Sequence, residues 1–402
     1  MKQDVYIIAA QRTAIGSYLG AFKDVSPARL GADIIKDILN KTQLNPKNID
    51  EVIVGNVLSP GQGQGLARQV SILGGIPFEV PAYAINMVCG SGLKAVMNGV
   101  DAISNASAHL VFAGGVESMS QAPYLVSHKT RSGHKMGDLT MVDAMIHDAL
   151  TDAFDHTHMG ITAENIAQSY AITREAQDAF AMHSQEKAIN AIDAGVFRDE
   201  ITPVTISTRN GDVVVDVDEY PNRNTSMAKL AKLRPAFKKE GTVTAGNASG
   251  INDGASFVLL SDQETLDKTS IQPLARIVSM GQGGVDPKMM GMGPVPAINQ
   301  ALMRANLSLQ DIDVLELNEA FAAQSLGVIQ TLSETYNIST QELMDKTNIH
   351  GGAIALGHPV GASGNRILVT LTHELKRSQK RYGLASLCIG GGMGVAIIIE
   401  SV

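Results

Sequence analysis

The 402-residue sequence contains two cysteines, and each stands in a glycine-rich segment. Cys89 ends an apolar stretch and is followed by Gly90, Ser91 and Gly92, after which apolar residues recur at helical spacing. This pattern predicts a thiol at a tight turn that leads into the N-terminus of a helix. Because the helix dipole and free backbone N–H groups favour a thiolate there, we expect a lowered pKa and a nucleophile.

A base for this thiol is predicted in the second half of the chain. His358 lies in the segment Gly357–Gly364, where neighbouring Gly and Pro restrict the backbone, as a preorganised base requires. Cys388 precedes Gly390–Gly392, whose backbone N–H groups could face a developing oxyanion. Asn318 ends a buried strand, where open α/β sheets present functional groups. The second thiol, Cys388, beside the nucleophile Cys89 and the base His358 suggests a reaction with two proton transfers.

The elements that must position these residues show an internal duplication. Three segments of the first half recur in order in the second half: Leu44–Val52 with Leu307–Leu315, Cys89–Gly92 with Gly361–Gly364, and Phe112–Gly115 with Leu387–Gly391. Each half alternates short aliphatic strands with helices, which favours α/β layers with mainly parallel sheets. The stretch from Ser120 to Gly250 is richer in Met, His and polar residues and contains a helical pattern over 173–194. We interpret it as an insertion in the first half.

The composition excludes several function classes. The formal net charge of −8 gives a field that repels phosphate backbones, and the absence of Trp argues against a stacking platform for nucleic acid. The aliphatic runs are far shorter than the ~20 residues that span a bilayer. Residues 1–12 lack a leader pattern, and Val5–Ala10 predict an early strand. We therefore expect a soluble, cytoplasmic protein without nucleic-acid or membrane partners.

Other motifs carry weaker signals. The segment Gly61–Arg68 looks like a dinucleotide loop, but no reading frame completes G-x-G-x-x-G/A. His156 and His158 lack the spacing and thiolate partners of a zinc site, so we expect no metal. The basic run from Lys229 to Lys239 could steer a phosphate-bearing small ligand. Two cysteines are too few for a disulfide scaffold.

Five motifs in combination resemble the thiolase family over essentially the whole chain: Asn86–Gly92, Gly115–Ser120, Asn318–Phe321, Gly357–Gly364 and Cys388–Gly392. The resemblance implies an α/β fold of two similar βαβαβαββ halves in a five-layer α-β-α-β-α sandwich with an inserted loop domain. It implies an N-terminal half at residues 1–119 and 250–272, the loop domain at 120–249 and a C-terminal half at 273–402.

The resemblance also implies an acetyl-CoA C-acetyltransferase, which condenses two acetyl-CoA reversibly to acetoacetyl-CoA and CoA. Cys89 would carry the acetyl group, His358 would activate it, and Cys388 would remove a proton from the methyl group of the second acetyl-CoA. Asn318, through a water, and His358 would form one oxyanion hole. The backbone N–H groups of Cys89 and Gly390 would form the other. The coenzyme A thioesters are substrates, so no separate cofactor is implied.

The positions that match the family's acyl and coenzyme A pocket are His158, Met159, Phe237, Ala245, Ser249, Met290, Ala320 and Phe321. The stretch around Met136 is similar to the loop that builds tetramers in the biosynthetic, acetoacetyl-CoA-forming branch, so a homotetramer is implied. A role in lipid metabolism, such as the mevalonate pathway, is implied with it. Where many relatives place an arginine against the coenzyme A nucleotide, this chain has Asn222, followed by Arg223.

Several alternatives stay open on the residues alone. A degradative 3-ketoacyl-CoA thiolase of broader chain length would keep the fold and change the substrate. A Cys–His hydrolase would convert acetyl-CoA to acetate, and a non-catalytic protein would bind coenzyme A without turnover. A ketoacyl synthase is disfavoured because that branch lacks a counterpart of Cys388. The products formed from acetyl-CoA, and thiolysis rates across chain lengths, separate these hypotheses.

Overall fold

The computed structural model describes residues 3–402, and the expected early strand over Val5–Ala10 is part of its first strand. Its strands are β1 Val5–Arg12, β2 Gly16–Ser17, β3 Glu51–Gly55, β4 Ala82–Ile85, β5 Leu110–Ser118, β6 Tyr124–Val126, β7 Met141–Asp143, β8 Val204–Thr208, β9 Gly211–Val215, β10 Asn252–Asp262, β11 Ala275–Gly284, β12 Val314–Leu317, β13 Tyr382–Ile389 and β14 Met393–Ser401.

Its α-helices are α1 Pro27–Thr42, α2 Leu66–Leu73, α3 Ser91–Ser104, α4 Met159–Ser169, α5 Arg174–Asp193, α6 Met227–Leu230, α7 Gln263–Asp267, α8 Pro294–Ala305, α9 Ala322–Tyr336, α10 Thr340–Lys346, α11 Ala353–Leu356 and α12 Val360–Ser378. Shorter helical turns are η1 Pro46–Asn48, η2 His128–Ser132, η3 Met145–Leu150, η4 Pro287–Met292 and η5 Leu309–Asp311.

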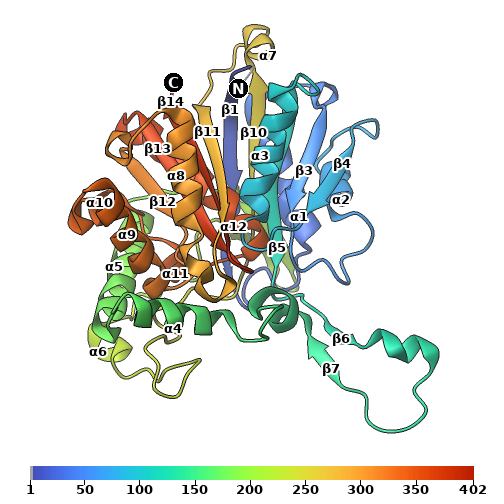
Figure 1. The fold of residues 1–402 in the computed structure, drawn as a ribbon. Coiled ribbons are helices and arrows are strands. Elements are labelled where there is room, and N and C mark those ends of the chain that lie inside the picture. Colours follow the sequence, from blue (N-terminus) through green and yellow to red (C-terminus); the bar gives the residue numbers. More distant parts are fainter. Residues whose placement is uncertain (1–2) are drawn as a thin grey trace.

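The large sheet repeats one arrangement twice (Figure 1). The first half has the order β4-β3-β5-β10-β1, and the second half repeats it from β3 onward as β12-β13-β14-β11. An isolated parallel bridge between Leu315 and Thr347 takes the place of β4 in the second half. The two halves join where β1 pairs with β11. The predicted duplication is therefore confirmed, because each matched pair of segments occupies equivalent places.

The prediction of mainly parallel sheets is wrong. Within residues 3–402 the parallel pairs of the large sheet are β3–β4, β3–β5 and β12–β13, whereas β1, β10, β11 and β14 pair antiparallel with their neighbours. The reason is visible in the connection between β13 and β14, where Gly391 and Gly392 take positive φ values in a tight turn. A turn this short can join only antiparallel strands, since a parallel pair needs a long crossover.

Helices α3 and α12 form the middle layer of the fold. Their apolar side chains, including Leu93 and Leu368, are buried together with residues from strands of both halves, such as Val111 and Leu387. Helices α1 and α2 pack on the outer face of the first half, and α8 and α9 pack on that of the second. This order is the five-layer α-β-α-β-α sandwich, and it brings the N-terminal ends of α3 and α12 together.

The inserted stretch gathers at the end of the molecule opposite to both termini (Figure 1). It contributes α4, α5, α6 and two small two-stranded sheets, β6–β7 and β8–β9. Helix α5 agrees with the predicted 173–194 pattern: the Thr173 side chain accepts a hydrogen bond from the N–H of Ala176 at its start, and Gly195, just past its end, has a φ of 72°.

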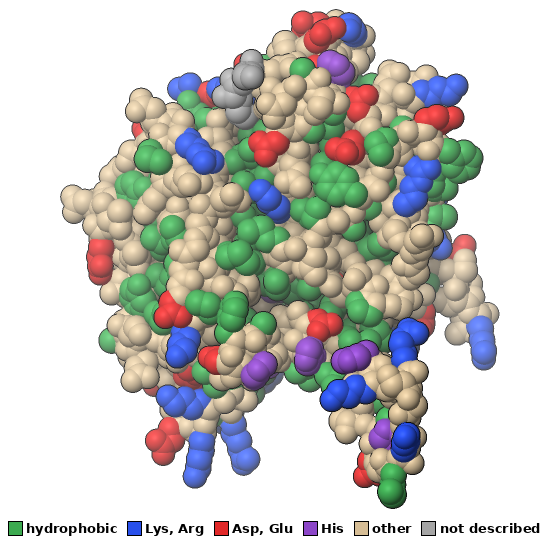
Figure 2. All heavy atoms as spheres, turned by 45° about the vertical axis from the view of Figure 1, so that its right-hand side comes forward, with side chains coloured by type: hydrophobic (Ala, Val, Ile, Leu, Met, Phe, Trp, Pro, Cys, Tyr) green, Lys and Arg blue, Asp and Glu red, His purple; other side chains and the backbone are tan. Residues whose placement is uncertain are grey.

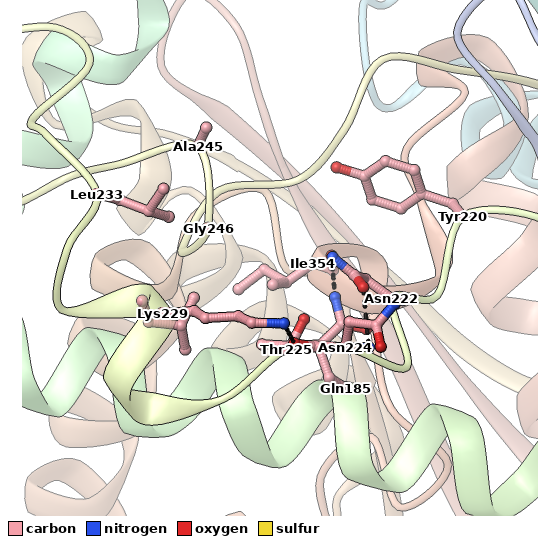
Figure 3. Close-up of a pocket in the computed structure, with 11 residues that line it drawn as sticks. Gln185, Tyr220, Asn222, Asn224, Thr225, Lys229, Leu233, Ala245, Gly246 and Ile354 are labelled. Atoms are coloured by element: carbon pink, nitrogen blue, oxygen red, sulfur yellow. Dashed lines mark hydrogen bonds between the residues drawn. The ribbon is translucent and has the colours of Figure 1, made fainter.

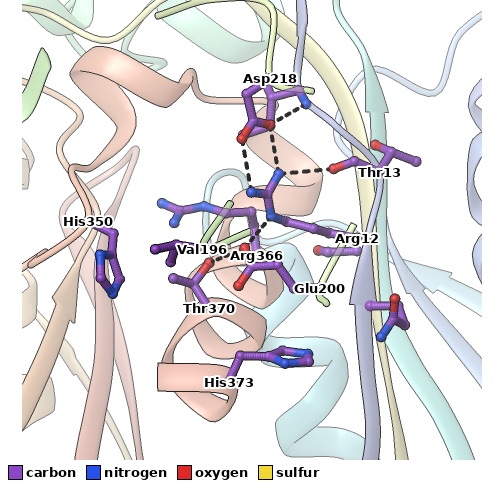
Figure 4. Close-up of polar contacts among 12 residues, drawn as sticks. Arg12, Thr13, Val196, Glu200, Asp218, His350, Arg366, Thr370 and His373 are labelled. Atoms are coloured by element: carbon purple, nitrogen blue, oxygen red, sulfur yellow. Dashed lines mark hydrogen bonds and ion pairs between the residues drawn. The ribbon is translucent and has the colours of Figure 1, made fainter. Parts of the chain in front are cut away.

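A buried ion cluster ties the inserted stretch to both halves (Figure 4). Arg12 ends β1 and is fully buried; its Nε donates to Glu200 Oε1 at 2.6 Å, and its two terminal nitrogens donate to Asp218 at 2.7 and 2.9 Å. The Thr370 hydroxyl of α12 also donates to Glu200, at 3.0 Å. Because both carboxylates belong to the insertion, the cluster fixes it against the sandwich.

Replacing Arg12 by Met should destabilise the fold. Loss of the guanidinium leaves Glu200 and Asp218 as buried carboxylates without their cation, which costs about 3–5 kcal/mol in comparable buried pairs. Urea unfolding followed by circular dichroism measures the change. The exposed Lys268–Glu264 pair, 2.7 Å apart, provides the control, because Lys268→Met should not shift the midpoint measurably. Equal midpoints for both variants would contradict this assignment.

Candidate active site

Cys89 lies on a strained turn between β4 and α3. The residue before it, Val88, is β-branched and yet has a φ of 46°, a conformation that such residues rarely adopt and that concentrates at functional sites. Gly90 is the N-cap of α3, and a Cβ at this position would lie 2.4 Å from the Ile389 side chain. The predicted turn before a helix is therefore confirmed, and glycine lets it approach the β13–β14 connection.

The expectation of a lowered pKa at Cys89 is wrong. The side chain is only partly exposed, and burial raises its pKa to about 11. The backbone N–H groups of Gly390 and of Cys89 itself act in the opposite direction, and the charge of Glu117 raises the pKa further. Burial outweighs the helix N-terminus, so the resting group is a thiol that needs a base.

Cys388 belongs to the second half and lies near the same place as Cys89. It is almost completely buried, and burial raises its pKa, with the charge of Cys89 as the second cause. Its side chain packs in an apolar cluster with Met159, Met290 and Phe321, which also contains Ala320 and borders Phe237. The two thiols thus influence each other electrostatically, as a site with two proton-transfer groups requires.

His358 is held rigidly at the start of α12. Its N–H donates to Asn252 Oδ1 at 2.9 Å, and a Cβ at Gly357, whose φ is 106°, would lie 2.5 Å from the Asn252 side chain. Burial, and secondarily the charge of Arg366, lowers the pKa of His358 to about 4. The imidazole is therefore neutral at physiological pH and can accept a proton. Its Nε2 lies 3.5 Å from Asn318 Nδ2, as expected for neighbouring site residues.

A cavity of about 510 Å³ leads to this group of residues. It is lined by the predicted His158, Phe237, Ala245, Ser249 and Phe321, by His358, and by Met119 and Val360 of the quoted motifs. Residues outside the motifs also line it, including Tyr18, Leu150 and Tyr220. Cys89 packs against the cluster that holds Met119 and Val360. Met159, Met290 and Ala320 lie behind the wall, around Cys388, and none of the three lines the cavity itself.

His158 presents a defined face to the cavity. Its ring stacks on Phe237 with centroids 4.6 Å apart, and its Nδ1 accepts the N–H of Gly160 at 3.0 Å. Burial lowers the pKa of His158, so the ring is neutral and its proton lies on Nε2. Within residues 3–402 no group of three or more His, Cys, Asp or Glu side chains is placed to hold a metal ion.

A second cavity, of about 390 Å³, adjoins the first and shares Tyr220 and Ala245 with it (Figure 3). Its lining combines polar and aliphatic residues: Gln185, Asn222, Asn224, Thr225, Lys229, Leu230, Leu233, Gly246 and Ile354. Asn222 therefore lines a cavity. The neighbouring Arg223 is paired with Asp193 at 2.5 Å, on the exposed surface.

Comparisons with known proteins agree with this geometry. The family model described as "Thiolase, N-terminal domain" matches residues 5–264, and "Thiolase, C-terminal domain" matches residues 271–401. The chain belongs to the thiolase family. It is 52% identical to a probable acetyl-CoA acyltransferase of Staphylococcus aureus (strain COL), over 98% of both chains.

Solved structures of thiolases superpose on the whole chain. One is an acetyl-CoA acetyltransferase of Bacillus anthracis, with a TM-score of 0.95, 42% identity and coverage of 100% of this chain and 99% of that one. Another is human mitochondrial 3-ketoacyl-CoA thiolase in complex with CoA, with a TM-score of 0.93, 44% identity and coverage of 100% and 98%. The fold expected from the motifs is thereby confirmed.

Ser363 is a residue of this thiolase that the sequence reasoning did not single out. Its Oγ lies 2.6 Å from His358 Nδ1 and 2.9 Å from the carbonyl oxygen of Pro359. The hydroxyl has a single proton, which it donates to Pro359, so it accepts the Nδ1–H of His358. This bond leaves Nε2 as the basic nitrogen. A serine five residues after a histidine, on the first turn of a helix, is the signal that could have revealed it.

Replacing Ser363 by Ala should lower kcat by about 10–100-fold, by analogy with the loss of groups that orient a histidine. Without the hydroxyl, the imidazole loses the acceptor that fixes its proton on Nδ1. KM should stay within about twofold, because Ser363 does not line the cavity. Steady-state thiolysis rates measure both constants. Ser363→Thr keeps the hydroxyl and is the control; a Thr variant as slow as the Ala variant would contradict the hydrogen-bond explanation.

Proposed function

We propose that this thiolase is an acetyl-CoA C-acetyltransferase that works through an acetyl-Cys89 intermediate. The observation that carries the proposal is the convergence of Cys89, Cys388, His358 and Asn318 beside a cavity of about 510 Å³. The relatedness to acetyl-CoA acetyltransferases over the full chain supports the same activity. The chain is accordingly an acyltransferase.

In the acylation step, His358 Nε2 takes the proton of the Cys89 thiol, and the sulfur attacks the thioester carbonyl of acetyl-CoA. The backbone N–H groups of Cys89 and Gly390, which face the Cys89 sulfur, stabilise the oxyanion. The bond to coenzyme A then breaks, and the proton passes from His358 to the leaving thiolate. A neutral imidazole beside a neutral thiol is the protonation state from which this transfer starts.

In the condensation step, Cys388 as a thiolate removes a proton from the methyl group of the second acetyl-CoA. Its raised pKa makes that thiolate a strong base, as removal of a carbon-bound proton requires. The carbanion attacks the acetyl group on Cys89, the new carbon–carbon bond replaces the bond to Cys89, and acetoacetyl-CoA forms. Asn318 and His358 stabilise the enolate oxygen. The abstracted proton passes from Cys388 to the departing Cys89 thiolate, which restores the Cys89 thiol and the Cys388 thiolate with which the step began.

The two adjoining cavities suit the two parts of a coenzyme A thioester. The mostly apolar first cavity takes the acyl group and the pantetheine arm, and the second cavity, which is the more polar of the two, takes the nucleotide. Amide side chains of Asn222, Asn224 and Gln185 and the Lys229 ammonium surround that second space. The nucleotide contact thus rests on Asn222 and Lys229, while Arg223 stays with Asp193. No separate cofactor or metal takes part.

Product analysis tests the proposal. Acetyl-CoA alone should yield acetoacetyl-CoA and free CoA, and thiolysis of 3-ketoacyl-CoA esters should be fastest for the four-carbon substrate. The alternative, a degradative thiolase of broader chain length, is favoured by the 44% identity to human 3-ketoacyl-CoA thiolase. Thiolysis rates that stay equal or rise at eight carbons and beyond would replace the first assignment with the second. Acetate as the sole product would reveal a hydrolase.

The arm that carries β6 and β7 is the surface for assembly into a homotetramer. It extends from the body of the molecule (Figure 1), and Figure 2 shows Lys, Arg and His beside hydrophobic side chains near that end. Tyr124, Met136, Leu139 and Met141 are exposed on it, Met136 by 90%. Light scattering should give a tetramer, and Met136→Asp with Leu139→Asp should give a smaller species. A tetrameric double variant would exclude this surface.

No helix of the described residues combines the length and apolar character needed to cross a membrane. A cytoplasmic location and a role in lipid metabolism stay predictions of the sequence.

A further inference from the structure

Glu117 is a buried acid that the proposed chemistry does not use. It is the penultimate residue of β5, and its side chain is fully buried. In the part of the chain that the structure describes, no Lys, Arg or His forms an ion pair with it. Burial raises the pKa of Glu117 to about 7, against the effect of three backbone N–H groups that lower it. Because a buried carboxyl group without a cation is costly, its presence here indicates a structural or functional role.

The two carboxylate oxygens of Glu117 accept four hydrogen bonds from two sides. Oε1 accepts from Asn56 Nδ2 at 3.0 Å and from the N–H of Leu58 at 3.2 Å. Oε2 accepts from the N–H groups of Val57 and Gly361, both at 3.0 Å. Residues 56–58 follow β3 of the first half, and Gly361 belongs to the first turn of α12 in the second half. The Glu117 carboxylate therefore links the two halves by hydrogen bonds, and we call this set of four hydrogen bonds the joint.

On one side this joint leads to the nucleophile. Val57, whose N–H binds Glu117, receives on its carbonyl oxygen the side-chain amide of Asn86 at 3.4 Å. The other end of that amide accepts the N–H of Val88 at 2.9 Å. Val88 is the strained residue directly before Cys89. A short chain of hydrogen bonds thus runs from Glu117 to the turn that aims the Cys89 sulfur.

On the other side the joint leads to the base. Gly361 comes three residues after His358 and two before Ser363, the partner of its imidazole. The packing leaves no space for adjustment: a Cβ at Gly361 would lie 2.6 Å from Glu117 Oε2, and a Cβ at Gly115 would lie 2.0 Å from the Gly361 carbonyl oxygen. Any displacement of the carboxylate must therefore move the first turn of α12, and His358 with it.

We propose that Glu117 is a positioning residue of the thiolase reaction, whose carboxylate fixes the spacing between Cys89 and His358 across the two halves. The inference rests on the proposed function for its catalytic consequence. Its four N–H donors favour the ionised form and oppose burial, which favours the protonated one. Spacing matters because proton transfer from thiol to imidazole depends steeply on distance, and misplacement by about 1 Å costs about 100-fold in rate.

The direct test is Glu117→Gln, which keeps the size of the side chain. On the Oε2 side its –NH2 group would face the backbone N–H groups of Val57 and Gly361, and on the Oε1 side it would face the N–H of Leu58. Either orientation therefore loses at least one backbone hydrogen bond of the joint. We expect kcat to fall by about 10–100-fold, with KM changed by less than about twofold, because Glu117 lines neither cavity. Iodoacetamide alkylation of Cys89 in the protein without substrate, followed by peptide mass spectrometry, should slow in the same ratio, since it needs the same thiol–imidazole geometry.

The matched control is Glu164→Gln. Glu164 is also buried, and its carboxylate also clamps backbone N–H groups, those of Thr242 and Val243 at 2.8–2.9 Å, but within the insertion. Its variant should lose thermal stability while kcat and the alkylation rate stay within about twofold of the parent. A Glu117 variant that loses only stability, as the control does, would overturn the proposal.

A second variant keeps the test decisive if Glu117→Gln does not fold. Gly361→Ala keeps the Glu117 side chain but adds a methyl group 2.6 Å from its Oε2, which must push the carboxylate aside. It should therefore show the same loss of kcat and of alkylation rate. Unchanged kcat in folded Gly361→Ala would equally overturn the proposal. If the parent protein turns over no acyl-CoA, the proposed function fails, whereas the alkylation ratio still reports whether Glu117 positions the thiol and its base.

Discussion

Cys89→Ala should abolish condensation and thiolysis together. Both directions pass through the acyl-Cys89 thioester, and no other exposed or partly exposed thiol exists in the chain, since Cys388 is buried. Removal of a nucleophile that acts as a unit with its base costs about 10⁶-fold in a well-studied hydrolase, so we expect a loss of at least about 10⁴-fold. Mass spectrometry after incubation with acetyl-CoA should find no acetylated active-site peptide in the variant.

Substrate binding separates this result from misfolding. Cys89 lines neither of the two cavities, so Cys89→Ala should still bind CoA in calorimetry with a dissociation constant close to that of the parent. Cys89→Ser, which keeps a poorer nucleophile at the same place, should retain slow acetylation. Turnover by the Ala variant above about 1% of the parent would remove Cys89 from the reaction.

Cys388→Ala should divide the reaction into its two halves. The variant still has Cys89, His358 and the N–H of Gly390, so acetyl-CoA should acetylate Cys89 and release one equivalent of CoA. It lacks the base for the methyl proton, and general acid–base catalysis contributes about 10²–10⁴-fold, so acetoacetyl-CoA formation should fall by that factor. A rapid-quench measurement of CoA release, beside steady-state condensation, records both effects.

The size of the burst provides the control for Cys388→Ala. A burst of CoA equal to the number of sites shows that the fold and the first step are intact. Cys388→Ser tests the identity of the base, because an alcohol has a much higher pKa than a thiol and should restore little condensation. Condensation at the parent rate in Cys388→Ala would show that another group removes the proton.

The sequence by itself determined the chemistry-bearing residues and the duplicated plan. Gly90 and Gly92 around Cys89, followed by helically spaced apolar residues, are local signals, and the structure places Cys89 directly before α3. His358 at the start of α12 and Cys388 at the end of β13 follow from equally short motifs. The repeated segments predicted equivalent places in two halves, because a strand–helix unit carries its own pattern of buried positions.

Only the tertiary structure decided the protonation states and the partners. The helix N-terminus predicted a lowered pKa for Cys89, but burial by residues of both halves raises it to about 11, and burial is a property of the assembled sandwich. The contacts that orient the site join distant segments: Glu117 binds Gly361, and Asn252 binds His358. Short motifs record what a segment can do locally. Desolvation and long-range hydrogen bonds arise only when the layers close around the two cysteines.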